Sequence, residues 1–212
     1  MRKILLALTI LSAMHLRAQE IINIVLVGPN GITNSIEVAE SFIVIKKFPG
    51  YYERIDYKKG GPRIRSRSFR DSSLTVLHGD FLQYRADGGL RATGHYKDNK
   101  KSDSWKTYDD EGKLVSFLKY ENDSLIETVG VEKKDPVIAY EKKAEFPGGD
   151  NAWKKYINKS LERNRPAAKT AGGGMVVVTF VITENGQVED AQIVKSLEFS
   201  LDEDFLTTIR QS

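Results

Sequence analysis

The chain has no cysteine and only three histidines among its 212 residues. The absence of cysteine excludes disulfide bonds, thiol nucleophiles, cysteine zinc sites and a lipid anchor on cysteine. The few histidines leave little for metal binding or for acid–base catalysis near neutral pH. No apolar run reaches the roughly 20 residues that span a bilayer. The six prolines are scattered rather than gathered in a spacer. These shortages argue against most enzyme classes and against a membrane-spanning mature chain.

What is present begins with a segment typical of a secretory signal. Arg2 and Lys3 precede an apolar stretch from Ile4 to Ala13, and Ala18 supplies a small residue for cleavage. We predict a signal peptide over residues 1–18 and a mature chain outside the cytoplasm; an uncleaved N-terminal anchor is the alternative. Three of the 32 Lys and Arg residues lie in this segment, which leaves 29 basic against 29 acidic residues. That balance gives no reason to expect nucleic-acid binding.

Positive charge gathers between residues 46 and 70. A stretch of this kind can face an anionic surface, or it can be the solvated face of ordinary strands. Only Glu53 and Asp56 oppose it with negative charge. The basic residues are Lys46, Lys47, Arg54, Lys58, Lys59, Arg63, Arg65, Arg67 and Arg70.

Residues 79–123 repeat themselves after a shift of 24 positions. An aromatic strand, a glycine turn and a second strand ending in tyrosine recur, which indicates a stacked structural unit. Asp-Gly turns favour hairpins, and neighbouring hairpins must share an aromatic face to be stable. The matching pairs are Phe81 with Trp105, Tyr84 with Tyr108, Gly88 with Gly112 and Tyr96 with Tyr120.

The unit GDFLQYRADGGLRATGHYKDNKK and the next one, DSWKTYDDEGKLVSFLKYEND, resemble the variant form of the MORN repeat. The resemblance implies an antiparallel sheet of hairpins with a scaffolding or interaction role and no catalytic residues. We predict a β-rich domain over residues 19–135, clearest over 79–123. The charged, proline-terminated run at 132–136 is predicted to be a linker.

The C-terminal segment, residues 136–212, predicts a helix, two strands and a second helix. Asp150 is placed to cap the first helix, whose apolar face is predicted to hold Trp153, Ile157 and Leu161. Asn185-Gly186 is a strong hairpin signal between a strand at 175–182 and a strand at 188–195.

The second helix is predicted to begin at a capping box made by Ser200 and Glu203. Its apolar face combines Leu201, Phe205 and Ile209.

The stretches AEFPGGDNAWKKYINKSL and GGGMVVVTFVITENGQVEDAQIVKSLEFSLDEDFL resemble the C-terminal domain of TonB-type energy transducers. The resemblance implies a periplasmic module that binds the TonB box, a short extended peptide of outer-membrane TonB-dependent transporters, by strand addition. In the family, an inner-membrane motor drives such a module, so motor proteins would be partners of an anchored chain. The family's last strand has no counterpart before Ser212, which indicates an incomplete domain or a fragment. The predicted fold class is therefore α+β: an antiparallel β repeat followed by a small two-helix module.

Without that last strand, the second strand of the hairpin is expected to be exposed. We predict partner binding at Gln192, Ile193, Val194 and Lys195; ordinary strand positions are the alternative reading. A second hypothesis is an envelope scaffolding protein that uses the repeat surface, with Tyr84, Trp105, Tyr108 and the basic stretch in contact with partners.

An enzyme is not expected, and no catalytic residue, cofactor or metal site is predicted. Residues 109–111 and 202–204 are acidic, and they are assigned to a turn and to a helix start, where carboxylates favour the helix dipole.

Overall fold

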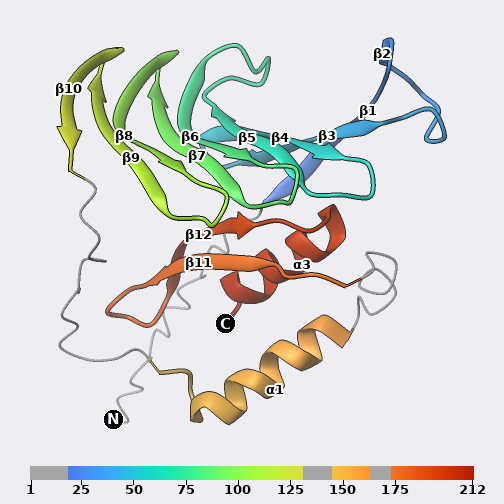
Figure 1. Ribbon diagram of the computed structural model, residues 1–212. Helices are drawn as coiled ribbons and strands as arrows, with labels where there is room; N and C mark the ends of the chain where they lie inside the picture. The colour runs from blue at the N-terminus through green and yellow to red at the C-terminus, as the bar shows by residue number, and fades with distance from the viewer. Residues whose placement is uncertain (1–18, 131–144, 163–172) are drawn as a thin grey trace, which may run out of the picture.

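The computed structural model describes residues 19–130, 145–162 and 173–212. Ten strands form one antiparallel sheet in the order β10-β9-β8-β7-β6-β5-β4-β3-β1-β2 (Figure 1). A two-stranded sheet and two helices follow, so the predicted α+β class is confirmed. The strands of the large sheet are β1 (Glu20–Gly28), β2 (Gly31–Ile32), β3 (Ser41–Phe48), β4 (Tyr51–Lys58), β5 (Arg63–Phe69), β6 (Leu77–Tyr84), β7 (Leu90–Lys97), β8 (Lys100–Tyr108), β9 (Leu114–Glu121) and β10 (Ser124–Val129).

The repeat is visible in the turns that close the β6–β7 and β8–β9 hairpins. Gly88 and Gly112 both have left-handed backbone, with φ of 85° and 81°. The amide of Gly88 donates to the carbonyl of Arg85 at 3.0 Å, and that of Gly112 to the carbonyl of Asp109 at 3.1 Å. Glycine suits both positions because a positive φ strains other residues. The predicted hairpin unit is confirmed.

The turns at the other end of the strands repeat as well. Asn99 and Asp123 have φ of 68° and 69°. Their side chains accept hydrogen bonds from the amides of Leu77 and Lys101, each at 2.7 Å. A short polar side chain that tolerates left-handed backbone and bonds the neighbouring backbone therefore joins one unit to the next.

The C-terminal elements cover one face of the large sheet. They are α1 (Gly149–Leu161), β11 (Val177–Ile182), β12 (Val188–Lys195) and α3 (Phe199–Arg210). In Figure 1, β12 and α3 lie against the sheet, and α1 lies farthest from it. One core cluster joins Leu82 and Tyr84 of the sheet to Ile193 and Leu206. A second joins Val44, Ile55 and Tyr57 to Phe199, so the two parts share their hydrophobic cores.

The predicted apolar faces of the helices are confirmed where their side chains are described; the side chain of Leu161 lies outside the described part. Leu201 and Ile209 of α3 are buried and Phe205 is half-buried, as are Trp153 and Ile157 of α1. Helix α1 is tied to α3 by the hydroxyl of Tyr156, which donates to the carbonyl of Thr208 at 2.9 Å.

Both predicted helix caps are wrong. Helix α1 follows Gly148, whose φ is 88°, and no side chain caps it. Asp150 lies inside the first turn, where its charge complements the helix dipole. Helix α3 is capped by Glu198, which accepts from the amides of Ser200 and Leu201 at 3.2 and 2.8 Å. Glu203 cannot take that role because its carboxylate faces Lys46 and Arg63.

The predicted signal peptide at 1–18 and the predicted linker at 132–136 lie outside the described residues. Within the described part, no helix combines the length and apolar character needed to cross a bilayer.

Candidate functional site

The hairpin of β11 and β12 forms as its sequence predicts. Gly186 has a φ of 76°, and its amide donates to the carbonyl of Thr183 at 2.9 Å. The amide of Gln187 donates to the hydroxyl of Thr183 at 3.1 Å, and the amide of Thr183 returns a bond to the carbonyl of Gln187 at 2.9 Å. These bonds close the loop through Asn185-Gly186 and set the two strands antiparallel.

The strand β12 lies between β11 and the large sheet (Figure 1). Lys195 forms an isolated bridge with Gly89, and the amide of Ser196 donates to the carbonyl of Gly88 at 2.9 Å. A Cβ at Gly88 would stand 2.0 Å from the carbonyl oxygen of Ser196. The absence of a side chain at Gly88 is therefore what lets the repeat turn touch the end of β12.

The residues predicted to bind a partner make contacts within the chain instead of forming an exposed edge. Ile193 is 1% exposed, and its carbonyl accepts from the hydroxyl of Tyr84 at 2.8 Å. Gln192 donates to Asp80 at 3.1 Å, and Lys195 lies 3.4 Å from a carboxylate oxygen of Asp87.

The exposure expected of this stretch is contradicted at Ile193, which is buried. Val194 is half-buried like Gln192 and Lys195. The large sheet packs against this strand through Leu82 and Tyr84, which contact Ile193. Whether these four residues bind a partner remains a prediction.

The more open edge of the small sheet is that of β11, because β12 is bonded to the large sheet at Ile193, Lys195 and Ser196. Among the described strands, β11 pairs with β12 alone. Three apolar side chains on or just before it are exposed: Met175 by 59%, Val181 by 53% and Ile182 by 45%. An edge strand presents unpaired backbone donors and acceptors, which a second extended chain can satisfy.

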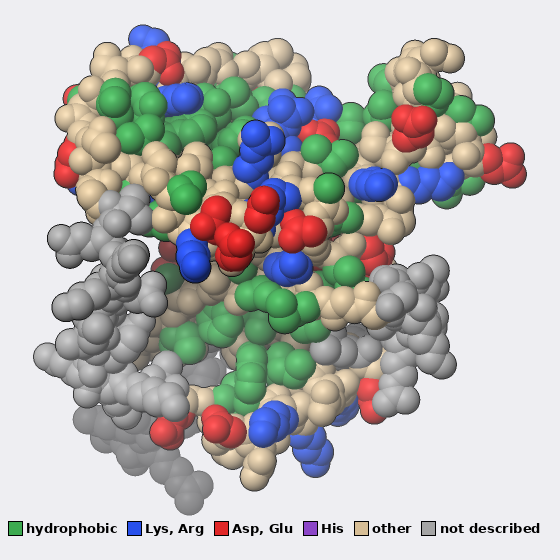
Figure 2. All heavy atoms as spheres, in the orientation of Figure 1, with side chains coloured by type: hydrophobic (Ala, Val, Ile, Leu, Met, Phe, Trp, Pro, Cys, Tyr) green, Lys and Arg blue, Asp and Glu red, His purple; other side chains and the backbone are tan. Residues whose placement is uncertain are grey.

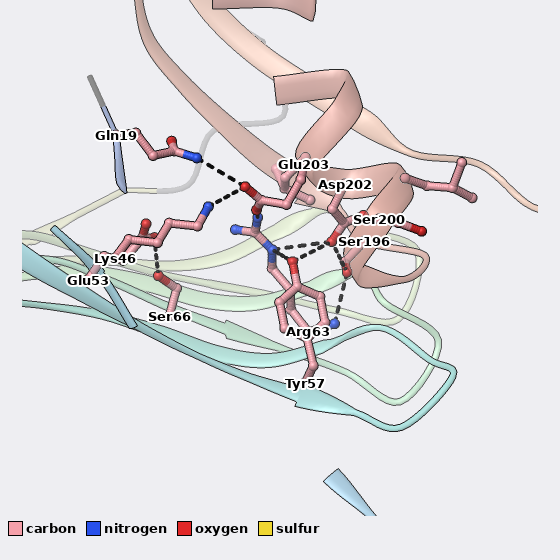
Figure 3. Close-up of polar contacts among 12 residues, drawn as sticks. Gln19, Lys46, Glu53, Tyr57, Arg63, Ser66, Ser196, Ser200, Asp202 and Glu203 are labelled. Atoms are coloured by element: carbon pink, nitrogen blue, oxygen red, sulfur yellow. Dashed lines mark hydrogen bonds and ion pairs between the residues drawn. The ribbon is translucent and has the colours of Figure 1, made fainter. Parts of the chain in front are cut away.

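Behind this hairpin, a buried ionic cluster fastens α3 to the large sheet (Figure 3). Nε of Arg63 lies 3.2 Å from Oδ2 of Asp202, and a terminal nitrogen of Arg63 lies 3.3 Å from Oε1 of Glu203. The ammonium of Lys46 pairs with the other oxygen of Glu203. Lys46 is 1%, Arg63 4% and Asp202 0% exposed. The solvated-face reading of the basic stretch is therefore wrong for Lys46 and Arg63.

Hydroxyl groups complete the cluster. The hydroxyl of Ser196 donates to Oδ2 of Asp202 at 2.6 Å and accepts from the amide of Arg63 at 2.8 Å. Tyr57 accepts from Nε of Arg63 at 2.7 Å and donates to Asp202 at 3.2 Å. Burial of this kind is tolerated because each charge has several partners.

Burial and charge act in opposite directions on the ionisable groups of the cluster. Burial raises the pKa of Asp202, and Arg63 and Ser196 offset only part of that rise. Burial also raises the pKa of Tyr57 well above its ordinary range. Burial disfavours the charged form of Arg63, but the negative charges of Asp202 and Glu203 help to outweigh it and raise its pKa.

Glu53 faces this cluster, and its ionisation is expected to make the free energy of unfolding depend on pH in the acid range. Burial works against its charge, but Lys46, Arg63 and a hydrogen bond from Ser66 lower its pKa below the ordinary 4.5. A lowered folded-state pKa stabilises the fold above the unfolded value, and this stabilisation is lost as pH falls through the folded value. Glu53→Gln is therefore expected to lower the free energy of unfolding by about 1.5–3 kcal/mol at pH 7 and by much less in strong acid.

Urea unfolding at a series of pH values measures this difference. Glu127→Gln is the control, because Glu127 forms an exposed pair with Lys119. Loss of this pair should lower the free energy of unfolding by less than about 1 kcal/mol. If the loss of unfolding free energy in Glu53→Gln stayed constant from pH 7 down to strong acid, a stabilising role of the Glu53 charge would be contradicted.

Sequence patterns missed this cluster, although two signals pointed to it. Lys46 follows Phe42 and Val44 at two-residue spacing and so shares their buried face. Asp202 precedes the buried Leu206 and Ile209 at helical spacing. No group of three or more metal-ligating side chains occurs in the described parts of the chain.

Comparison with known proteins finds a family match in the C-terminal part. Residues 165–212 match the family model described as the C-terminal domain of Gram-negative bacterial TonB protein. The match covers β11, β12 and α3, and no family match covers the MORN-like repeats. No curated protein and no solved structure matches the chain.

Proposed function

We propose that this chain is a TonB-like docking protein of the periplasm or cell envelope, active in energy-coupled transport. Its partner is an outer-membrane TonB-dependent transporter, whose extended TonB-box segment adds as a strand to the small sheet. The proposal assigns the chain no catalytic step. The family match over residues 165–212 and the more open edge, that of β11, support it.

The edge of β11 carries the proposal. Alternate residues within Val177–Ile182 turn their backbone amide and carbonyl away from β12, next to exposed apolar side chains. Backbone hydrogen bonds would supply most of the affinity, and alternate side chains of the added segment would supply specificity. The residues Gln192–Lys195 are less suited, because Ile193 is buried and its carbonyl already accepts a bond from Tyr84.

Packing against the large sheet holds the two strands of the small sheet in place. Core contacts of Ile193 with Leu82 and Tyr84 hold β12 in place, and β12 in turn holds β11. A strand that is already ordered loses less conformational entropy on binding than a flexible one. An inner-membrane motor protein would be a further partner if residues 1–18 stay attached as an anchor; a cleaved signal would leave the module free in the periplasm.

Cysteine crosslinking tests the proposed edge, because the chain has no cysteine of its own. Three single variants place a thiol on β11 (Thr179→Cys), on β12 (Gln192→Cys) or on the repeat sheet (Ser116→Cys). The probe is a synthetic TonB-box peptide of a TonB-dependent transporter, made in versions that carry one cysteine at successive positions.

Thr179→Cys is expected to crosslink with every second peptide position, since side chains of an added strand alternate between faces. Preferential crosslinking through Gln192→Cys would move the site to β12. Crosslinking through Ser116→Cys alone, or through none of the three, would refute strand addition to this sheet.

A further inference from the structure

The face of the large sheet that points away from the C-terminal module carries arginines beside aromatic rings. Ile55 and Tyr57 of β4 belong to the core cluster against which Phe199 of α3 packs, so Arg54 and Asp56, which alternate with them, point to the opposite side. Strand register pairs Arg54 with Arg67, and Arg67 with Phe81. These side chains therefore share one face, which we call the outer face.

The charges on the outer face do not balance. The carboxylate of Asp56 accepts hydrogen bonds from Nε of Arg54 at 2.9 Å and from a terminal nitrogen of Arg67 at 3.0 Å. Nε of Arg65 lies 3.5 Å from Oδ2 of the same carboxylate. Three guanidinium groups thus share one carboxylate. The Nε atoms of Arg65 and Arg67 are buried without a hydrogen-bond acceptor in the described structure.

Solvation and like charge both act on these arginines. Burial lowers the pKa of Arg67, and the neighbouring charges of Arg65 and Arg54 lower it further, while Asp56 offsets part of the effect. The side chain of Arg65 is still 41% and that of Arg54 32% exposed. An added anion would therefore find accessible donors and relieve the repulsion among them.

A cluster of half-exposed rings continues from the arginines along the same face. Phe81 stacks on Trp105 with ring centroids 5.5 Å apart, and Tyr96 meets Trp105 edge-on at 5.1 Å. Gly94 makes room for the indole, since a Cβ there would lie 2.4 Å from it. Figure 2 shows Lys and Arg side chains beside hydrophobic ones on the part of the sheet away from the module.

We propose that the outer face binds an acidic peptide segment of a partner protein. Carboxylates of the segment occupy the guanidinium groups of Arg54, Arg65 and Arg67, and an apolar side chain rests on Phe81 and Trp105. This site is separate from the edge of β11 and does not depend on the proposed docking there.

The composition of the face selects a peptide among possible anions. Planar guanidinium groups match carboxylates in a bidentate way, and arginine, tryptophan and tyrosine dominate the binding energy of protein interfaces. An anionic membrane is drawn to clusters of about four to eight basic residues. Here the three arginines surround a single carboxylate, Asp56, and the ammonium of Lys101 lies over the Trp105 ring, an arrangement that suits the separate carboxylates of a peptide.

The test uses the full chain and two blocked hexapeptides. One has four glutamates followed by two phenylalanines, and its control has glutamine in place of glutamate. The chain has two tryptophans, so a Trp153→Phe background leaves Trp105 as the single fluorescent reporter on the outer face. Calorimetry gives the affinity independently.

The acidic peptide is expected to bind and to change Trp105 fluorescence, whereas the glutamine peptide binds at least tenfold more weakly. Arg54→Gln and Arg65→Gln should each weaken binding about tenfold. Arg70→Gln is the matched control, because it removes the same charge from an exposed pair with Asp98 and should leave binding unchanged. Gln83→Glu, opposite Arg65, adds a competing carboxylate and should weaken binding without removing an arginine.

Several results would overturn the proposal. One is equal affinity for the acidic and the glutamine peptide. Another is a loss of affinity in Arg70→Gln as large as in Arg54→Gln. A third is unchanged affinity in both Arg54→Gln and Gln83→Glu. Tighter binding of vesicles containing phosphatidylglycerol than of the acidic peptide, lost in Arg65→Gln, would assign the face to a membrane instead.

Discussion

Replacing Arg63 by methionine is expected to lower the free energy of unfolding by about 3–5 kcal/mol. The change keeps an unbranched side chain of comparable length but leaves Asp202 without its guanidinium partner and Glu203 with Lys46 as its remaining cationic partner, beside a hydrogen bond from Gln19. Asp202 is fully buried, so its charge has no access to water. Urea unfolding at pH 7, followed by circular dichroism, measures the loss.

Two further variants separate the buried charge from a general loss of arginine. Arg70→Met removes an arginine from a surface pair with Asp98 and should matter by less than about 1 kcal/mol. Adding Asp202→Asn to Arg63→Met should recover part of the loss, because it removes the unpaired charge. A loss below about 1 kcal/mol in Arg63→Met, or no recovery in the double variant, would contradict the role given to the cluster.

Gly88→Ala is expected to be the second most damaging substitution. Gly88 has a φ of 85°, and an added Cβ would approach the carbonyl oxygen of Ser196 to 2.0 Å. Left-handed backbone alone disfavours alanine by about 1–2 kcal/mol. The added Cβ also forces the turn away from the end of β12. Such overpacking typically lowers the free energy of unfolding by about 1–3 kcal/mol more.

The repeat supplies a matched control for this substitution. Gly112 occupies the same position one unit later, with a φ of 81°, and an added Cβ there would meet nothing within 4 Å. Gly112→Ala should therefore show the backbone effect alone. Thermal unfolding of the two variants measures the difference, and equal losses would show that contact with Ser196 contributes nothing.

Local patterns predicted the elements well because turn chemistry and spacing act over a few residues. The left-handed turn at Gly88 recurs at Gly112, and both follow from Asp and Gly in the sequence. The hairpin at Asn185-Gly186 and the apolar face of α3 were readable in the same way.

Contacts between distant residues were not readable in this way. Arg63 and Glu203 are 140 positions apart, and no spacing rule links them. The carboxylates of Asp202 and Glu203 fitted a helix start, which is where they lie, but the large sheet supplies their partners. The predicted capping box was wrong as well: Glu198 caps α3, and Glu203 pairs with Lys46 of the sheet.

The surroundings of the predicted docking residues Gln192–Lys195 also depend on contacts between distant residues. The sequence predicts two strands, but which of them faces the large sheet depends on the packing of Ile193 against Leu82 and Tyr84. That packing reversed the expected exposure of Ile193. Tyr84 likewise belongs to the shared core, at 5% exposure, and cannot take part in the surface role expected for it.

Amide hydrogen exchange followed by NMR tests strand addition most directly. The full chain is exchanged with and without a synthetic TonB-box peptide of a TonB-dependent transporter. Alternate amides within Val177–Ile182, those not bonded to β12, are predicted to slow, while exchange within Val188–Lys195 stays as it was. Slowing centred on Gln192–Lys195, or confined to the ten-stranded sheet, would contradict docking at the edge of β11.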